Sequence, residues 1–393
     1  MISEDEARAR ILANLQPLPL RRLPLIDALN CFCGRDLFAR ISLPSFDNSS
    51  MDGFAVISAD AKPGARLKLI GEQPAGIDRQ LQIRPGEAIR IFTGAPIPAG
   101  ADAVVMQEDT ALEGNALTLM AEVAPGENIR RRGGDVAEGQ KIISAGEQLR
   151  AQQLALLAAQ GFGEVEVGGQ VRVAIISTGD ELVAPGGDLQ AGQIYDSNSV
   201  LLRALVRTTG ATIHSVTHCG DREEETEAAL RAGHAADIMI ISGGVSVGAR
   251  DFVKSSLTAV GATLDLWRVS VKPGKPFLFG RSGHCPIFGL PGNPISVFVT
   301  FLLFVRVAIL RMSGANTTAL ELRRQSARLN AAISNPGERP HYIRGVLGNG
   351  EFIPVGRQES HALFGLSRSN ALLRLPAGAE AAAGGEVTVL LWD

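Results

Sequence analysis

Charged side chains follow several short apolar segments of this sequence, in positions where they could bind a metal ion together with a phosphate. The carboxylates are Glu181, Asp221 and Asp251, and the ammonium groups are Lys272 and Lys275. Carboxylates alone would repel a phosphate, whereas Mg²⁺ binds one or two carboxylates together with phosphate oxygens and water. These residue types therefore indicate a phosphorylated ligand that binds together with Mg²⁺.

Two glycine-containing loops lie in the same part of the sequence. One is Ser-Thr-Gly-Asp at 177–180, and the other is Ser-Gly-Gly-Val-Ser-Val-Gly at 242–248. Backbone N–H groups that such loops expose next to a helix N-terminus bind phosphate well. The candidate ligand-binding residues of the two loops are Ser177, Thr178, Gly179, Asp180, Gly243, Gly244, Ser246 and Gly248.

An α/β domain with a parallel sheet would bring these loops together. Continuous apolar strands that alternate with helices are typical of a parallel sheet with helices on its faces. The predicted strands are 171–176, 212–216 and 238–241, and the predicted helices are 197–209, 223–232 and 251–260. Ligands bind beyond the carboxyl ends of the strands in such sheets, and the charged and glycine-rich loops follow those ends.

Each feature also has a simpler explanation. Asp180, Asp221 and Asp251 each precede a possible helix and could be N-caps. Gly243-Gly244 could form a tight turn without a ligand, and the two lysines could be solvated. Because polar residues follow every predicted strand at one edge of the sheet, we favour the ligand-binding interpretation.

The segment Gly244-Val-Ser-Val-Gly248 matches the nucleophile elbow of serine hydrolases, with Ser246 as the nucleophile. Asp265 and His284 follow it in the order that hydrolases use. An elbow turns directly into its helix, however, whereas Ala249 and Arg250 separate this segment from the predicted helix start. A serine hydrolase is therefore the less favoured alternative.

The remaining sequence predicts three further domains. An amphipathic helix with a capping box at Ser3 and Glu6, a second helix at 24–34 and a third at 151–160 predict a discontinuous linking domain. Short alternating segments separated by Pro-Gly turns predict a β-rich insertion domain. The predicted boundaries are 1–40 with 139–168 for the linking domain, 41–138 for the insertion, 169–315 for the α/β domain and 316–393 for a C-terminal β domain.

Composition and charge exclude several classes of function. A formal net charge of -3 and an aromatic content of 5% argue against binding to nucleic acid or to an anionic membrane. The apolar run 295–305 is shorter than the roughly 20 residues of a transmembrane helix. The N-terminus is acidic where a signal peptide would be basic, and the four cysteines form no C-x-x-C pair. We expect a cytoplasmic protein.

Three polar motifs stand out in the β-rich segment. They are Ser-Met-Asp-Gly-Phe-Ala at 50–55, Phe-Thr-Gly-Ala-Pro-Ile-Pro at 92–98 and Arg-Arg-Gly-Gly-Asp at 131–135. Asp-Gly, Thr-Gly and Gly-Gly pairs are ordinary hairpin signals, and an arginine run is often a solvated surface. Turn chemistry therefore explains these motifs equally well.

Taken in order, these motifs and four later ones resemble the MoeA family of molybdopterin molybdenumtransferases, which is related to the E domain of gephyrin. The later motifs are Ser-Thr-Gly-Asp-Glu-Leu at 177–182, the glycine-rich loop at 242–248, Lys-Pro-Gly-Lys-Pro at 272–276 and Leu-Pro-Gly-Asn-Pro at 290–294. The resemblance extends over almost the whole chain.

The resemblance implies a homodimer of four-domain subunits with a molybdopterin-binding α/β domain and a C-terminal β-barrel-like domain. It implies that molybdate is inserted into adenylylated molybdopterin in the presence of Mg²⁺, and that AMP is released. The cleft would lie between the α/β domain of one subunit and the β-rich domain of its partner. Proteins of the molybdenum-cofactor pathway are further expected partners.

The resemblance also assigns roles to residues. Acidic and hydroxyl groups of the two domains would serve catalysis: Asp52, Thr93 and Asp135 from the β-rich domain, and Glu181, Asp221 and Asp251 from the α/β domain. Asp221 and Asp251 would be the main Mg²⁺ ligands, with Glu181 as a third.

Basic and cleft-wall residues complete the set that the resemblance implies. Lys272 and Lys275 would bind an oxyanion or phosphate, Pro291 and Pro294 would shape the cleft wall, and Arg344, Ser360 or Ser369 would contact molybdate. Arg268 stands where the family often has Lys, so a planar guanidinium replaces a compact ammonium there. A non-catalytic dimeric scaffold like the gephyrin E domain stays open as an alternative.

Overall fold

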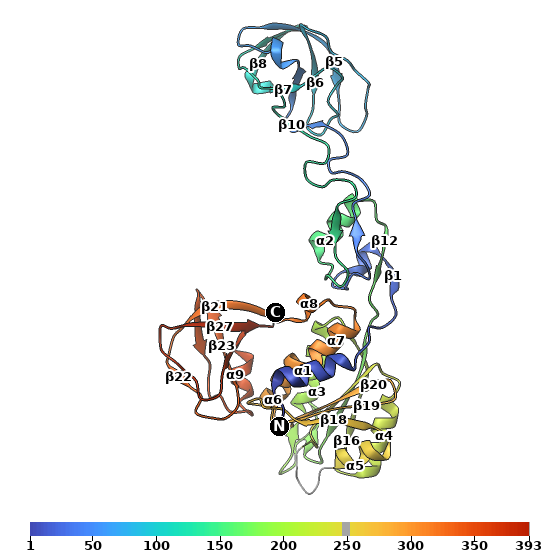
Figure 1. The fold of residues 1–393 in the computed structure, drawn as a ribbon, viewed down its shortest axis with the longest axis vertical. Coiled ribbons are helices and arrows are strands. Elements are labelled where there is room, and N and C mark those ends of the chain that lie inside the picture. Colours follow the sequence, from blue (N-terminus) through green and yellow to red (C-terminus); the bar gives the residue numbers. More distant parts are fainter. Residues whose placement is uncertain (246–251, 393) are drawn as a thin grey trace. The chain divides into compact units, whose positions relative to one another are not determined.

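A computed structural model describes residues 1–245 and 252–392. The chain divides into two compact units, and Figure 1 identifies their elements. Unit 1 comprises Met1–Arg35, Ala145–Ala155 and Gly163–Asp393, and unit 2 comprises Asp36–Ser144 and Leu156–Phe162. The four-domain boundaries inferred from the sequence stay a prediction.

The sheet at the centre of unit 1 is mixed. Its strand order is β16-β13-β17-β20-β19-β18, with β13 at Arg172–Thr178, β16 at Thr212–Cys219, β17 at Ile238–Ser242, β18 at Thr263–Arg268, β19 at Pro276–Ser282 and β20 at Cys285–Leu290. The first four strands are parallel, whereas β19 runs antiparallel to both β20 and β18. The predicted α/β fold is confirmed. Its sheet is not parallel throughout, because a hairpin, not a crossover helix, joins β19 to β20.

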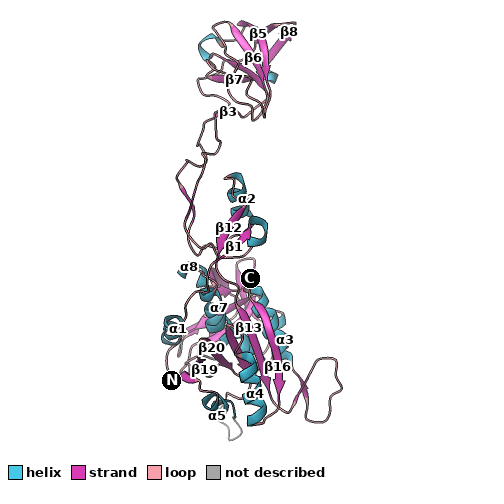
Figure 2. Ribbon diagram, turned by 90° about the vertical axis from the view of Figure 1, so that its right-hand side faces the viewer, coloured by secondary structure: helices cyan, strands magenta, loops and turns pink. Residues whose placement is uncertain are grey.

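Helices cover both faces of this sheet (Figure 2). They are α3 at Ser197–Thr208, α4 at Glu223–Gly233, α5 at Phe252–Ala259, α6 at Pro294–Thr300 and α7 at Arg306–Met312. Val173 and Ile175 of β13 share a core with α3, α6 and α7, whereas Ala174 and Ile176 share the other core with α4 and α5. Alternate side chains of a strand point to opposite faces, so residues 173–176 of β13 are apolar toward both cores.

The apolar run 295–305 belongs to a longer helical segment. A turn of π-helix, η4 at Phe301–Val305, joins α6 to α7. The resulting helix, Pro294–Met312, has 19 residues and is long and apolar enough to cross a membrane by length and composition alone. Of an 18-residue stretch of this helix, 83% is buried inside the protein. The core that the helix shares with the sheet therefore explains its apolar character.

The N-terminal part of unit 1 differs from the sequence prediction at one element. Helix α1 at Glu4–Ala13 begins at the predicted cap, because the Ser3 side chain accepts a hydrogen bond from the backbone N–H of Glu6. The prediction of a helix at 24–34 is wrong. This region instead contains strand β1 at Arg21–Pro24 and a 3₁₀ turn at Leu25–Ala28. Strand β1 pairs antiparallel with β12, at Glu164–Val167, and Phe32 and Cys33 form isolated β-bridges to Gln148 and Val167 where the helix was expected.

The C-terminal part of unit 1 is a closed β-barrel, as the resemblance implied. Its strands are β21 at Arg323–Leu329, β24 at Glu351–Pro354, β23 at His341–Gly348, β25 at Ala371–Leu375 and β27 at Glu386–Leu391. The barrel meets the α/β part through a backbone hydrogen bond of 2.8 Å from the Tyr342 N–H to the Lys272 carbonyl oxygen. The Tyr342 hydroxyl also hydrogen-bonds to Glu4 of α1.

Unit 2 is built mainly from strands, as the β-rich texture of its sequence predicted. Its six-stranded sheet has the order β7-β4-β6-β5-β9-β8. The bounds are β4 at Gly53–Val56, β5 at Arg66–Gln73, β6 at Glu87–Ile91, β7 at Ala103–Met106, β8 at Thr110–Glu113 and β9 at Ala116–Leu119. The inner side chains of these strands, such as Phe54, Leu67 and Leu117, form a separate small core.

Candidate functional site

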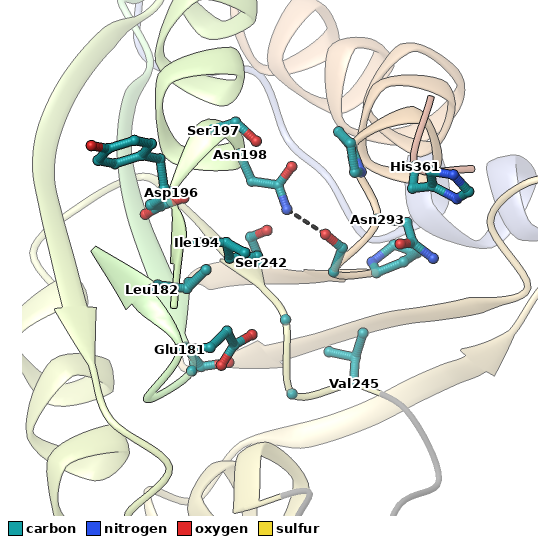
Figure 3. A pocket seen from close by; sticks show the side chains of 18 of the residues that line it. Glu181, Leu182, Ile194, Asp196, Ser197, Asn198, Ser242, Val245, Asn293 and His361 are labelled. Atoms are coloured by element: carbon teal, nitrogen blue, oxygen red, sulfur yellow. Dashed lines mark hydrogen bonds between the residues drawn. The ribbon is translucent and has the colours of Figure 1, made fainter. Parts of the chain in front are cut away.

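Pocket A lies at the carboxyl ends of the parallel strands in unit 1 and has a volume of about 640 Å³. Figure 3 shows side chains of residues that line it. Eight residues predicted from the sequence line it: Thr178, Gly179, Glu181, Asp221, Gly243, Gly244, Pro291 and Pro294. Ser242, at the start of the second glycine-rich loop, lines it as well. Ser177 is buried just below, at the end of β13.

Gly243 and Gly244, which follow β17, leave no room for side chains. Gly243 has φ +91°, and a Cβ atom there would lie 2.8 Å from the Thr178 carbonyl oxygen. Gly244 has φ +61°, and its Cβ would lie 2.6 Å from the Val253 side chain. Both conformations favour glycine, and the close approach of Thr178 from β13 and of Val253 from α5 accounts for the pair. The same packing keeps the backbone of these two glycines at the pocket wall.

The acidic residues are held by the two loops that follow β13 and β16. The Asp180 carboxylate accepts a hydrogen bond of 3.2 Å from the Asp221 backbone N–H. The α4 N-cap is Arg222, without a side-chain cap bond, so Asp221 does not serve as the N-cap that the simpler explanation proposed. Asp180 is exposed and contacts the neighbouring loop, whereas Glu181 and Asp221 line the pocket.

The donor set fits a hard cation that binds with a phosphate. Glu181 and Asp221 come from adjacent loops and line the same pocket, and Mg²⁺ prefers one or two carboxylates supplemented by phosphate oxygens and water. Over residues 1–245 and 252–392 there is no cluster of three or more His, Cys, Asp or Glu side chains that could bind a metal without such a ligand. The third predicted carboxylate, Asp251, lies outside the described residues, as do Ser246 and Gly248.

Pocket B adjoins pocket A and is rich in cationic side chains. Its volume is about 780 Å³, and Lys272, Lys275, Arg339, His341 and Ser360 are among the residues that line it. Four residues line both pockets: Pro276, Pro291, Asn293 and His361. The two pockets therefore share the wall that the segment 290–294 forms.

His341 is an uncharged member of this cationic pocket. Only 8% of its surface is exposed, and burial, followed by the nearby charges of Lys272, Arg344 and Arg339, lowers its pKa to about 4. The imidazole is therefore neutral near pH 7. Its buried Nε2 atom has no hydrogen-bond partner among the described residues, so a bound oxyanion is a suitable partner for it.

Three residues that the resemblance implied lie elsewhere in unit 1. Arg344 is 1% exposed and donates to the backbone carbonyl oxygens of Glu359, at 3.4 Å, and Arg357. The Ser369 hydroxyl donates to the Gly365 carbonyl oxygen at 2.7 Å, and Arg268 is exposed on β18. Among the described lining residues of pockets A and B, none of these three occurs.

The predicted residues of unit 2 are exposed, and two of them contact each other. The Thr93 backbone N–H and hydroxyl donate to one Asp52 carboxylate oxygen at 2.7 and 2.8 Å. These two hydrogen bonds, the backbone one first, hold the pKa of Asp52 below its usual range, so this exposed carboxylate stays ionised. Asp135 is exposed as well, and its backbone N–H donates to the Leu43 carbonyl oxygen at 3.0 Å.

The hydrolase alternative gains no support from its two described members. Asp265 forms an ion pair of 4.0 Å with Arg281. His284 precedes β20, at the end of that strand opposite to pocket A, and lies beside His234. Neither residue lines pocket A.

The sequence reasoning missed a polar segment that lines pocket A. Asp196, Ser197 and Asn198 open helix α3 there. Asp196 is its N-cap and accepts a hydrogen bond of 2.9 Å from the Ser199 N–H. The Asn198 side-chain amide donates to the Gly292 carbonyl oxygen at 2.6 Å (Figure 3). The Asp-Ser-Asn sequence before an amphipathic helix is an N-cap signal, but it follows no strand of the central sheet.

Three family models match consecutive parts of the chain. "MoeA N-terminal region (domain I and II)" matches residues 2–161, "Probable molybdopterin binding domain" matches 174–311 and "MoeA C-terminal region (domain IV)" matches 326–392. Most residues that line the carboxylate-containing pocket A lie in the second of these segments, and His361 and Leu363 lie in the third. The fold and the matched segments define a protein of the MoeA type.

Individual relatives cover nearly the full length. The chain is 38% identical over 388 residues to the molybdopterin molybdenumtransferase of Haemophilus influenzae, which covers 95% of this chain and 94% of that protein. It is 38% identical over 385 residues to molybdopterin molybdenumtransferase 2 of Mycobacterium tuberculosis, with 94% of each chain covered. The crystal structure of the molybdopterin biosynthesis MoeA protein from Pyrococcus horikoshii OT3 superposes with a TM-score of 0.87 at 30% identity, over 100% of both chains. The chain belongs to the molybdopterin molybdenumtransferase family, a family of enzymes of molybdenum cofactor biosynthesis.

Proposed function

We propose that this enzyme inserts molybdate into adenylylated molybdopterin in an Mg²⁺-dependent reaction that releases AMP. The observation that carries the proposal is the shared wall of pockets A and B. One pocket offers carboxylates and a glycine-rich backbone, and the other offers lysines, an arginine and a neutral histidine. Two substrates of different chemistry, a nucleotide-linked pterin and an oxyanion, suit such a pair of pockets.

Pocket A suits the phosphate part of the pterin nucleotide. Gly179, Gly243 and Gly244 keep backbone at its wall without side chains, and Glu181 with Asp221 would hold Mg²⁺. When bound, Mg²⁺ would neutralise phosphate charge and polarise the phosphorus. Pro291 and Pro294 stiffen the wall toward pocket B.

Pocket B suits molybdate. Lys272 and Lys275 supply positive charge, and Ser360 with the uncharged His341 supplies hydrogen-bond donors. In this proposal a molybdate oxygen attacks the pterin-side phosphorus of the diphosphate link in place of water. The bond from that phosphorus to the bridging oxygen breaks, and AMP leaves with this oxygen. Positioning and charge neutralisation supply most of the rate, as in other phosphoryl chemistry.

The proposal includes a cytoplasmic homodimer. Asp52, Thr93 and Asp135 would act as further substrate contacts that the second copy of the chain contributes, and other proteins of the pathway would deliver the pterin. If so, mixing inactive Asp221→Ala with inactive Asp52→Ala chains restores activity in the hybrid dimer. Sedimentation of the wild-type chain as a monomer would contradict the dimer.

The direct test measures AMP release from adenylylated molybdopterin with Mg²⁺, with and without molybdate. We expect release that depends on molybdate. In Asp221→Ala we expect a loss on the order of 10²-fold or more with an unchanged thermal melt. The exposed Asp27→Ala is the matched control.

Two outcomes would replace the proposal. A folded dimer that releases no AMP would support a non-catalytic scaffold. Release that does not depend on molybdate would indicate a nucleotide hydrolase, and labelling of Ser246 by a serine-directed phosphonate would identify a serine hydrolase.

A further inference from the structure

The wall between pockets A and B is the segment Leu290–Pro294, which joins β20 to α6. Pro291 and Asn293 line both pockets, and Gly292 lines pocket A. The position of this segment therefore determines how far apart, and in what orientation, the contents of the two pockets lie.

Hydrogen bonds from three separate parts of unit 1 hold this segment. At its start, the Gly243 N–H donates to the Leu290 carbonyl oxygen at 3.1 Å. Just beyond its end, the Ile295 N–H donates to the Ser360 carbonyl oxygen at 3.0 Å. Between them, the Asn198 side-chain amide donates to the Gly292 carbonyl oxygen at 2.6 Å. The first two bonds are made by backbone, whereas the third depends on one side chain.

Asn198 is itself held firmly. It lies in the first turn of α3, whose N-cap Asp196 is 7% exposed and bonded to the Ser199 N–H. The other atom of the Asn198 amide, Oδ1, is buried without a hydrogen-bond partner among the described residues. Only the N–H side of an amide can donate to a carbonyl oxygen, so this orientation follows from the contact with Gly292.

We propose that Asn198 is a positioning residue that aligns the two substrate pockets by fixing the Gly292 carbonyl, and with it the wall between them. The inference rests on the two-substrate function proposed above. Asn198 lines pocket A beside the shared wall (Figure 3), and its effect is on the geometry between the two reactants. Such alignment acts on the chemical step, because misplacement by about 1 Å can lower a rate roughly 10²-fold.

The test uses Asn198→Asp and Asn198→Ala in the full-length enzyme. The aspartate has the size of asparagine but, when ionised, cannot donate to a carbonyl, so it removes the hydrogen bond and keeps the volume. We expect kcat for AMP release to fall roughly tenfold to 10²-fold in both variants. The KM values for molybdate and for the pterin nucleotide, and the melting temperature, should stay close to wild type.

Asn14→Asp is the matched control, because its side-chain amide also donates to a backbone carbonyl, that of Arg10 at 2.8 Å, on helix α1 away from both pockets. It should leave kcat unchanged. Asn198→Gln retains a donor on a longer stem and should recover part of the lost rate.

Hydrogen exchange gives a readout that needs no turnover. Loss of the anchor should raise exchange in the peptide around 290–297, where the Ile295 N–H reports, and leave β13 and β17 unchanged. The proposal would be overturned by unchanged hydrogen exchange, or by an unchanged kcat with raised exchange. It would also be overturned if the variants changed only one KM value, or if a lower melting temperature explained the lost activity. If the wild-type enzyme shows no molybdate-dependent AMP release while the variants show raised hydrogen exchange, both the alignment role and the proposed function are overturned. Asn198 would then be a structural anchor of the 290–294 segment only.

Discussion

Acidification should destabilise unit 1 through protonation of one of its histidines, His341. Burial and the neighbouring cations lower its pKa from 6.5 to about 4. Between these two pH values the imidazole is protonated in the unfolded chain and neutral in the folded chain. Stability is therefore highest above the unfolded pKa and is lost as the pH falls toward the folded pKa. At about 1.4 kcal/mol per pH unit, the loss between about pH 7 and pH 4 amounts to roughly 3 kcal/mol.

The assay is urea unfolding followed by tryptophan fluorescence between pH 7 and pH 4, for wild type and His341→Gln. Both tryptophans, Trp267 and Trp392, belong to unit 1, so the signal reports on the unit that contains the histidine. Carboxylates contribute to the pH dependence of both proteins alike, and the difference between the two curves isolates His341. His361→Gln, at an exposed histidine of the same pocket, is the matched control and should follow the wild-type curve.

Two results would refute the reasoning. Parallel curves for wild type and His341→Gln would mean that the imidazole accepts its proton equally well in both states. A wild-type curve that gains stability on acidification, relative to the variant, would mean that the folded state favours the charged form. Because nearby cations contribute to the shift, saturating molybdate should also reduce the difference between the curves, provided that it binds in pocket B.

Three other predictions concern separate parts of unit 1. Gly243→Ala should lower the free energy of unfolding by more than about 1 kcal/mol, because its φ is +91° and the new Cβ meets a backbone oxygen at 2.8 Å; a wild-type denaturation curve would contradict this. Tyr342→Phe should lower the free energy of unfolding by about 1–3 kcal/mol, because it removes the hydrogen bond between a buried hydroxyl and Glu4. Urea unfolding measures this change. Burial raises the pKa of the Cys285 thiol to about 12, so iodoacetamide at about pH 8 should label the half-buried Cys31 and spare Cys285 in the folded protein; rapid modification of Cys285 would be inconsistent with its burial.

Several features followed from sequence patterns because their causes are local. The apolar run of β13 and the glycine pair after β17 indicate a strand buried on both faces and a loop without side chains. Parallel topology then places the ends of such strands at one edge, which is why Glu181 and Asp221 could be expected in one pocket. The motifs also predicted the family, since each keeps its residue types and order.

The helix prediction that failed concerns a segment whose structure depends on distant partners. The helix expected at 24–34 does not form: a 3₁₀ turn occupies Leu25–Ala28, and Phe32 and Cys33 form β-bridges to Gln148 and Val167, far along the chain. The molybdate contact implied for Arg344 stays a prediction, and the structure adds that this side chain is buried against the carbonyl oxygens of Arg357 and Glu359. A sequence pattern carries no record of which carbonyl groups a long side chain will meet.

The sequence by itself determined which strands are buried, which loops carry carboxylates, glycines and lysines, and to which family the chain belongs. Each of these features can be read from a short stretch of consecutive residues. Only the tertiary structure decided that Asn198 meets Gly292, 94 positions later, and that His341 of the barrel joins Lys272 of the α/β part in one pocket. Both depend on the docking of complete elements. Packing of α3 beside the loop after β20 sets the first contact, and seating of the barrel against the Lys272 segment sets the second.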